Sequence, residues 1–272
     1  MSCATPPPPT PAGKRPFPHI RFLTAYFCPY AQRARIALEW YKGFERLLVQ
    51  MPFELVECLQ PGPRGYTKLP LLLENNPKGL VPTLIVEDNG SKTVVTESLD
   101  VIEYLDKLAR DTDISTAVDG LLPSDDDEGR QRSIDIAKTY NSSFCTRFIQ
   151  CFRQGKTEVF PEMVAALERF SSELVGPFYS GPSPCIVDVA VYPFAYGTAV
   201  LGASKGHEFT LTLDAHPQLS KYFNWFNTMS ELDSVKKSLL TPRQLTETYD
   251  RLKALSDRPS ETSRVAAIFS SP

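Results

Sequence analysis

The sequence predicts a small α/β domain followed by an all-helical domain. Strand-like and helix-like segments alternate between residues 19 and 110, and two strand-like runs there surround an Asn-Gly turn signal. From Asp111 onward the strand patterns give way to helical periodicity. At 272 residues the chain is long enough for two domains. We therefore expect a Pro-rich flexible arm at 1–18, the α/β domain at 19–110, a linker at 111–123, the helical domain at 124–256 and a Ser-rich tail at 257–272.

The α/β domain is predicted to open with a strand that runs into a helix. Residues 19–26 are rich in β-branched and aromatic side chains, and this run ends at Cys28-Pro29. Pro29 suits the first position of a helix, and residues 31–41 are good helix formers. The first strand should therefore end directly before a helix whose first residue is Pro29.

The remaining elements follow from periodicity and turn chemistry. The pattern predicts, in order, a strand at 53–59, a turn at 61–65, a short helix at 67–76, hairpin strands at 80–87 and 92–95, and a helix from Glu97. Asn89-Gly90 is the turn signal of the hairpin. The order β-α-β-α-β-β-α indicates a hairpin that joins an otherwise parallel sheet. In the second half, helices are predicted at 162–174, 186–201, 217–229 and 241–255.

Composition excludes several kinds of partner. The net charge is −3 and no block of Lys and Arg is present, which argues against nucleic acid and against anionic membrane surfaces as partners. The six cysteines show no CxxC pair and no disulfide framework, as expected for free thiols in a reducing compartment, and we expect a cytoplasmic protein. None of the three histidines has ligand spacing from a cysteine pair, so no metal site is expected.

The apolar run at 186–203 has two interpretations, a membrane span or a buried helix. The run contains Asp188 and Pro193, lies at the short limit for crossing a bilayer and lacks flanking basic anchors. A helix that is apolar on nearly every face is typical of the centre of an all-helical domain. We therefore predict a buried central helix and no stable membrane span.

Cys28 is the first candidate for chemistry. A thiol at a strand-to-helix junction meets backbone N–H groups and the positive end of the helix dipole, which favours the thiolate and predicts a lowered pKa. Arg33 and Arg35 add positive charge nearby. Ala31 stands where two-cysteine thiol enzymes carry their second cysteine, so an external thiol would have to resolve any mixed disulfide. The alternative is a buried structural cysteine, the commoner role of a lone cysteine.

Two further segments are weaker candidates when each is taken alone. Pro82 follows Val81 directly before a strand, a place where a cis proline lets the preceding backbone pair with an extended ligand. The alternative is an ordinary edge-strand proline. Glu97 and Ser98 begin a helix, where a carboxylate and a hydroxyl could hold the ammonium and carboxylate of an α-amino acid. The alternative is simple helix capping.

A family resemblance connects these segments. It lies in CPYAQRARIAL, NPKGLVPTL, VVTESLDVIEYLD and LLPSDD, which together resemble the glutathione transferase family and its omega class in particular. The resemblance extends over about residues 19–255. It implies a thioredoxin-like N-terminal domain, a helical domain that supplies a hydrophobic substrate subsite, glutathione as cofactor, and a homodimer.

The resemblance also assigns roles to individual residues. By position, Cys28 would be the catalytic nucleophile, and the residues implied in glutathione binding are Tyr30, Lys68, Val81, Pro82, Glu97 and Ser98. Lys68 would lie near the glycyl carboxylate, Val81 would pair its backbone with the cysteinyl part, and Glu97 with Ser98 would bind the γ-glutamyl end.

The sequence departs from the family pattern in two places. The family begins its central helix with a Ser/Thr-x-x-Asp capping box, whereas this chain has Cys185 three residues before Asp188. A poor cap acceptor therefore stands at that position, and we expect Ser183 to substitute or the helix to begin more weakly. The segment 41–52 is also longer than in omega members, which leaves the dimer edge and the substrate entrance open.

Three functions remain open from the sequence. The first is a glutathione-dependent thiol transferase, active in deglutathionylation and dehydroascorbate reduction through a Cys28 mixed disulfide. The second is a glutathione-dependent isomerase or a conjugating enzyme of a specific pathway. The third is a membrane-inserting binding protein that resembles chloride intracellular channels, against which the charges of Arg33, Arg35 and Glu39 argue.

Overall fold

The structure is a computed structural model that describes residues 18–43, 53–62, 65–111, 120–123 and 126–256. Its N-terminal part is built on a four-stranded sheet in the order β2-β1-β5-β6. The strands are β1 (His19–Thr24), β2 (Phe53–Glu57), β5 (Thr83–Asp88) and β6 (Ser91–Thr96). β1 pairs with β2 in parallel, whereas β1–β5 and β5–β6 are antiparallel. This topology confirms the predicted hairpin that joins a parallel pair.

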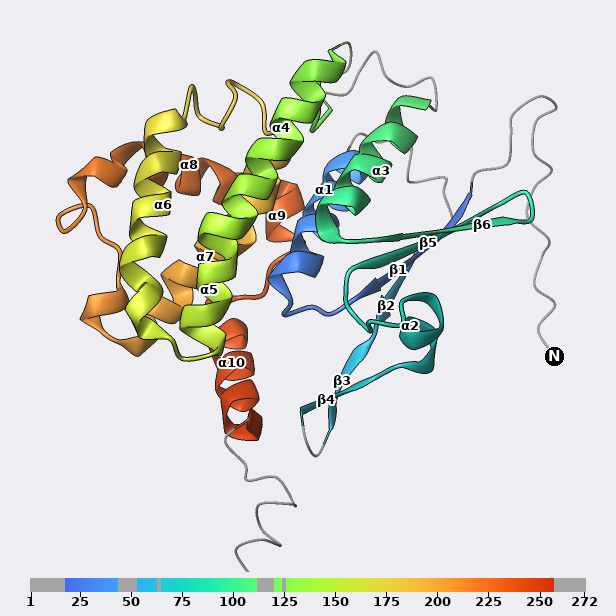
Figure 1. The fold of residues 1–272 in the computed structure, drawn as a ribbon, viewed down its shortest axis with the longest axis horizontal. Coiled ribbons are helices and arrows are strands. Elements are labelled where there is room, and N and C mark those ends of the chain that lie inside the picture. The colour runs from blue at the N-terminus through green and yellow to red at the C-terminus, as the bar shows by residue number, and fades with distance from the viewer. Residues whose placement is uncertain (1–17, 44–52, 63–64, 112–119, 124–125, 257–272) are drawn as a thin grey trace, which may run out of the picture.

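Helices cover both faces of this sheet (Figure 1). On one face, Phe22 and Leu84 belong to the core that includes α1 (Pro29–Gly43) and α3 (Ser98–Asp111). On the other face, Ile85 packs with Leu72 of α2 (Pro70–Asn75). Because successive strand residues point to opposite faces, neighbouring apolar residues of β5 serve two separate layers.

A second, small sheet corrects the prediction for residues 59–76. β3 (Leu59–Gly62) and β4 (Gly65–Lys68) form an antiparallel hairpin, so Thr67 and Lys68 are strand residues and not the start of a helix. The helix begins only at Pro70, because proline suits the first helical turn and the residue before it is extended. β3 and β4 lack the alternation of apolar and polar residues that is typical of strands, so their sequence did not predict them.

The hairpin between β5 and β6 turns where the sequence predicts. Asn89 and Gly90 both have positive φ angles, 48° and 82°, as a two-residue turn of this hand requires.

The C-terminal part is mainly helical over its described length. Its principal helices are α4 (Asp127–Tyr140), α5 (Thr146–Phe148), α6 (Phe160–Glu173), α7 (Ile186–Lys205), α8 (Ser220–Glu231), α9 (Asp233–Lys236) and α10 (Pro242–Ser256). π-helical segments at Asn141–Cys145 and Ile149–Arg153 lie on either side of α5 and continue the helix from α4. Short 3₁₀ turns cover Thr157–Val159, His207–Phe209 and Pro217–Leu219.

α7 is the buried central helix that the sequence predicts for the apolar run. It is the one helix in the described part of the chain long and apolar enough to cross a membrane by length and composition, and 78% of its most apolar window is buried inside the protein. Its start corrects the expectation that Ser183 would substitute for a poor cap acceptor, because the Cys185 side chain itself accepts the Asp188 backbone N–H. In return, the Asp188 carboxylate accepts the Cys185 backbone N–H at 2.8 Å and the Trp225 indole N–H at 2.6 Å.

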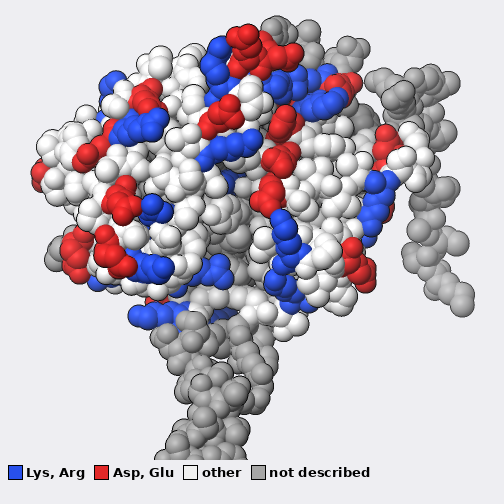
Figure 2. All heavy atoms as spheres, in the orientation of Figure 1, with Lys and Arg blue, Asp and Glu red and all other residues white. Residues whose placement is uncertain are grey.

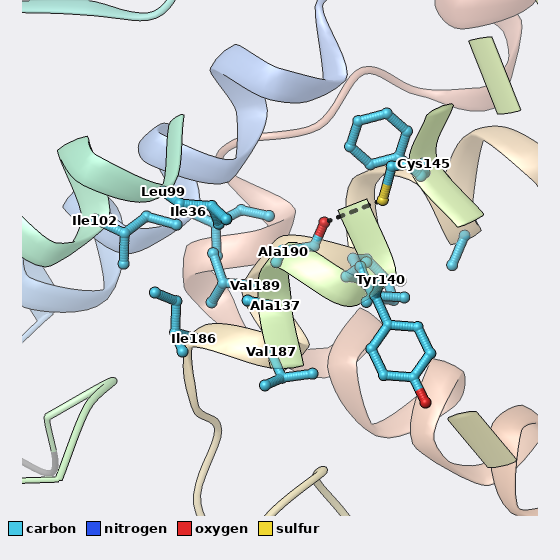
Figure 3. Close-up of a cluster of buried hydrophobic side chains, with 14 of the residues drawn as sticks. Ile36, Leu99, Ile102, Ala137, Tyr140, Cys145, Ile186, Val187, Val189 and Ala190 are labelled. Carbon is cyan, nitrogen blue, oxygen red and sulfur yellow. Dashed lines mark hydrogen bonds between the residues drawn. The ribbon is translucent and has the colours of Figure 1, made fainter. Parts of the chain in front are cut away.

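The two parts of the chain share one hydrophobic core. Figure 3 shows Ile36, Leu99 and Ile102 of α1 and α3 facing residues of α7 and α4. The end of the predicted linker belongs to this core as well, since Leu121 is fully buried and its carbonyl accepts the Ile186 N–H at 2.7 Å. The helical part is therefore packed firmly against one face of the α/β part. The arm, residues 44–52, most of the linker and the tail lie outside the described residues.

Candidate active site

Cys28 lies directly before α1, at the end of the loop that follows β1. Its backbone N–H donates to the Ala25 carbonyl at 3.0 Å, and its carbonyl accepts the Gln32 N–H at 2.9 Å. The Gln32 side chain also donates to the Tyr26 carbonyl at 3.0 Å, and the Tyr26 N–H donates to Glu57 on β2 at 2.9 Å. These contacts fix the backbone of Cys28 at the junction that the sequence predicts.

The charge balance at Cys28 differs from the sequence-based expectation. Burial raises the pKa of the Cys28 thiol above its ordinary value, and this effect outweighs the backbone hydrogen bonds from Ala31 and Tyr30 and the charges of Arg153 and Arg33, all of which lower it. The predicted helix-terminal N–H groups are therefore present, but the expectation of a net lowered pKa for Cys28 is wrong. Arg35 acts instead on the Glu57 carboxyl.

Arg33 has a structural position that the sequence did not indicate. Its side chain is 1% exposed and donates from Nε to the Ala190 carbonyl of α7 at 2.7 Å. Its Nη1 donates to Ser98 Oγ at 3.1 Å and to Asn141 Oδ1 at 2.9 Å. The guanidinium carbon also lies 4.6 Å from the ring centroid of Phe194. This buried cation thus ties α1 to α3 and to two helices of the other domain.

A cavity of about 860 Å³ opens beside Cys28, between the two domains. Every predicted site residue lines it: Cys28, Tyr30, Lys68, Val81, Pro82, Glu97 and Ser98. Residues far apart in sequence thus meet around one space, of a size typical for small-molecule sites.

The loop before β5 brings backbone to the cavity. The Val81-Pro82 peptide bond is cis, as the sequence suggested, and Val81 precedes the first residue pair of the β5 ladder. The Asn76 side chain holds this loop by donating to the Leu80 carbonyl at 3.0 Å and to Thr83 Oγ1 at 3.1 Å. The backbone of Val81 is therefore fixed at the cavity wall and lies outside the hydrogen-bonding ladder of the sheet.

Glu97 and Ser98 have different roles although they are neighbours. Glu97 has a φ of +68°, a strained conformation for this residue type, and its side chain is 62% exposed and 4.0 Å from the ammonium of Lys78. Ser98 is the first residue of α3 and is buried, and its hydroxyl accepts the hydrogen bond from Arg33. The strain and exposure at Glu97 fit a ligand-binding group, whereas the Ser98 hydroxyl is already engaged within the protein.

Lys68 reaches the cavity from β4. Its Nζ donates to the Lys78 carbonyl at 3.3 Å, and its side chain passes so close to Gly79 that a Cβ there would lie 2.6 Å from Lys68 Cδ. Gly79 also has a φ of +61°, so both its conformation and its lack of a side chain leave room for the lysine.

The helical domain supplies lining residues that sequence reasoning missed. They are Asn141, Phe152, Arg153, Gln154, Gly155, Lys205, Tyr249, Leu252 and Lys253. Asn141 and Arg153 stand at the two outer ends of the π-helical stretch, and such widened turns are frequent at functional sites. In sequence these positions have ordinary helical spacing, so nothing separated them from core or surface residues.

The charges of this cavity differ from those of the whole chain. Its lining contains Lys68, Arg153, Lys205 and Lys253 against the carboxylate of Glu97, although the chain carries a net charge of −3. Figure 2 shows Lys and Arg side chains on both sides of the lower part of the boundary between the domains.

Comparisons with known proteins fit this arrangement of a thioredoxin-like domain, a helical domain and a cavity between them. The family model "Glutathione S-transferase, N-terminal domain" matches residues 22–113. Protein IN2-1 homolog A from Oryza sativa subsp. japonica is 30% identical over 234 residues, which cover 84% of this chain and 85% of that protein. Glutathione S-transferase omega-1 from Rattus norvegicus is 26% identical over 233 residues, covering 84% and 81%.

A solved structure has the same fold. The crystal structure of rice GST1 in complex with glutathione superposes with a TM-score of 0.67 at 22% identity, over 89% of this chain and 98% of that one. The chain belongs to the glutathione S-transferase family, whose cofactor is glutathione, and within the family it is omega-like.

Proposed function

We propose that this protein is a glutathione-dependent thiol transferase in which Cys28 forms a mixed disulfide with glutathione. The observation that carries this proposal is the position of one sulfur. Among the cysteines of the described residues, Cys28 is partly exposed and lines the cavity, whereas Cys58, Cys145, Cys151 and Cys185 are buried. A thiol that meets substrate at the start of a helix suits nucleophilic attack on sulfur.

The residues around the cavity fit glutathione. Lys68 offers a cation for the glycyl carboxylate, and Glu97 offers a carboxylate for the γ-glutamyl ammonium. The backbone of Val81, next to the cis Pro82, lies outside the sheet and can pair with the cysteinyl part. Tyr30 supplies an aromatic wall beside the sulfur, packed edge-on to Phe194. For Ser98 we propose a smaller part, because its hydroxyl also accepts from Arg33.

In the first step, the Cys28 thiolate attacks the glutathionyl sulfur of a glutathionylated substrate. The bond between Cys28 and that sulfur forms while the substrate S–S bond breaks, and the released substrate thiolate takes up a proton. In the second step, the thiolate of another glutathione attacks the same glutathionyl sulfur, so that glutathione disulfide leaves and the Cys28 thiolate is regenerated. The proton lost by this second glutathione balances the one that the substrate gained.

The raised pKa of Cys28 sets the pH range of this chemistry. Only a minor fraction of the free enzyme carries the thiolate at neutral pH, but a thiolate of higher pKa is the stronger nucleophile. Dehydroascorbate reduction needs a different first step, in which the Cys28 thiolate adds to a carbonyl carbon of the substrate. The thiolate of one glutathione then attacks the Cys28 sulfur, the C–S bond breaks and ascorbate leaves with the protons of the two glutathiones. A second glutathione resolves the Cys28–glutathione disulfide, so two glutathiones are oxidised to the disulfide. A cysteine that competes for the disulfide is less suited to activate the glutathione sulfur for conjugation, so conjugation and isomerisation are the weaker candidates.

A membrane-inserting role receives less support. α1 packs between α3 and α7, and its Arg33 forms hydrogen bonds with three neighbouring elements. Insertion would have to break all of these contacts. We further propose a cytoplasmic homodimer, as is typical of the family.

The test is turnover of the mixed disulfide between glutathione and 2-mercaptoethanol, followed as glutathione disulfide formation. We expect Cys28→Ser to lower kcat/KM by at least about a thousandfold, because the nucleophile is lost. Cys58→Ala, which removes a buried thiol outside the cavity, should retain turnover. An active Cys28→Ser variant would overturn the proposal. If the wild type does not turn over the disulfide but conjugates glutathione to an electrophile, the alternative transferase function replaces it.

A further inference from the structure

The half of the cavity formed by the helical domain is basic, although its walls are partly aromatic and aliphatic. Arg153, Lys205 and Lys253 line it together with Phe152, Tyr249 and Leu252. The carboxylate of this cavity, Glu97, belongs to the other domain. The sequence predicted a hydrophobic subsite here, so the positive charge is an addition that the family resemblance did not imply.

These cations come from three separate elements. Arg153 ends the second π-helical segment, Lys205 ends α7, and Lys253 lies in the last turn of α10. A cation at a helix C-terminus complements the helix dipole, so a single basic residue at a helix end needs no further explanation. The dipole does not explain why three such residues from three elements line the same cavity.

Arg153 and Lys205 form no ion pair with a carboxylate in the described ranges. Arg153 lines the same cavity as Cys28 and Tyr249, and its positive charge acts on both of these groups. Lys205 Nζ lies 5.4 Å from the ring centroid of Phe152. Two cations without a carboxylate partner in the described part of the chain thus line a cavity whose wall is partly aromatic.

Glutathione does not account for these two cations under the proposed assignment. Its glycyl carboxylate is matched by Lys68 and its γ-glutamyl ammonium by Glu97, both on the α/β domain. Its γ-glutamyl carboxylate is matched by the backbone N–H groups at the start of α3. Arg153 and Lys205 lie across the cavity, where the group carried on the glutathione sulfur would project.

We propose that the second substrate is an organic carboxylate with an aromatic or apolar body, bound with its carboxylate toward Arg153 and Lys205 and its body against Phe152 and Tyr249. This inference rests on the proposed glutathione site and names the class of compound that the site handles. Arginine and lysine donors to a carboxylate are the stronger class of hydrogen bond, and rings beside them add apolar contact.

The test is a binding measurement that does not depend on turnover. Isothermal titration calorimetry compares S-(4-carboxybenzyl)glutathione with S-(4-carbamoylbenzyl)glutathione, which differ only in the charge of the distal group. At low salt we expect the carboxylate to bind about tenfold more tightly than the amide, as one charged hydrogen-bonded contact provides. This ratio should fall as salt is added, because the contact is electrostatic.

The ratio of the two affinities should fall in Arg153→Gln and in Lys205→Gln and persist in Lys138→Gln, a matched charge change at an exposed residue of α4. Because both compounds are measured on each variant, a general loss of folding lowers both affinities and leaves the ratio unchanged. Equal affinities in the wild type would overturn the inference while the glutathione site stands. Failure of both conjugates and of glutathione itself to bind would overturn the proposed function, and this inference with it.

Discussion

The thiols of Cys28 and Cys145 are both influenced by the Arg33 guanidinium, but they differ in their access to the cavity. Cys28 lines the cavity and is partly exposed, and the Arg33 charge is a minor influence on its pKa. Cys145 is fully buried at the domain interface, where its sulfur accepts a hydrogen bond from Arg33 Nη2 at 3.0 Å. Burial nevertheless raises the pKa of Cys145 to about 11.

This difference shows that a nearby cation alone does not make a cysteine reactive. Cys145 has the closer cation but does not line the cavity. Its thiol donates to the Ala190 carbonyl at 3.8 Å, and Figure 3 marks this contact with a dashed line. Cys28 has the weaker electrostatic support but meets the space in which substrate binds. We infer that access and backbone N–H groups define the reactive thiol here, while Arg33 mainly joins the domains.

Substitution of Arg33 should give the largest effect on stability, because Arg33 joins the two domains. Arg33→Gln would leave Ala190, Asn141 and Cys145 without a buried donor, and we expect a loss of roughly 3 kcal/mol in the free energy of unfolding. Arg33→Lys keeps the charge but not the planar fork, so it should recover only part of this loss. Urea denaturation measures both variants. An unchanged stability with a large change in Cys28 reactivity would assign Arg33 to the reaction instead of the interface.

Glu97 and Ser98 should differ as the two cysteines do: Glu97 should affect substrate binding, and Ser98 should affect stability. Ser98→Ala removes a buried acceptor of Arg33 and should cost about 1–2 kcal/mol of stability. Glu97→Gln should leave stability unchanged and raise the KM for glutathione about twofold to fivefold, the usual size for an exposed ion pair.

The control for Glu97→Gln is Glu74→Gln, which makes the same change at an exposed residue outside the cavity. Thermal melts and steady-state kinetics separate the two effects. A stability loss in Glu97→Gln without any change in KM would contradict the assignment of Glu97 to glutathione.

The pH dependence of Cys28 alkylation tests a smaller effect. It shows whether burial or the helix terminus controls the pKa of the reactive thiol. Because the folded pKa is raised, the thiol form dominates below it, and the rate should increase about tenfold per pH unit through neutral pH and level off only above the ordinary thiol range. Arg153→Gln should slow alkylation at neutral pH, since the positive charge of Arg153 lowers this pKa. Peptide mass spectrometry after iodoacetamide treatment measures the rate at Cys28 alone. A plateau that begins below neutral pH would show that the helix terminus outweighs burial.

The local features of the site could be predicted from the sequence, whereas its long-range contacts could not. Cys28-Pro29, Val81-Pro82 and Asn89-Gly90 act through their own backbone geometry, so short segments were enough to indicate them. Arg33 and Ala190 lie 157 residues apart, and only the packed domains bring them together. The sequence therefore suggested that Arg33 acts on Cys28, although its hydrogen bonds to described residues go to Ala190, Ser98, Asn141 and Cys145.

Two other differences have equally specific causes. Thr67 and Lys68 belong to a hairpin whose strands contain Pro61, Gly62 and Gly65, a composition that predicts turns and not strands. Cys185 caps α7 although sulfur is a weak acceptor, because Asp188 completes the reciprocal pair from the other side. Nothing in the sequence indicated that Arg153 and Lys205 line the cavity, since a basic residue near a helix end is common.

The most direct test of the central claim is to map glutathione adducts after incubation with glutathione disulfide. Intact-mass and peptide mass spectrometry would compare the wild type with Cys28→Ser and with Cys145→Ser. We expect one glutathione on Cys28 in the wild type and in Cys145→Ser, released by added reduced glutathione, and no adduct on the described cysteines in Cys28→Ser. An adduct on Cys145, or a wild-type Cys28 that stays unmodified, would contradict the account.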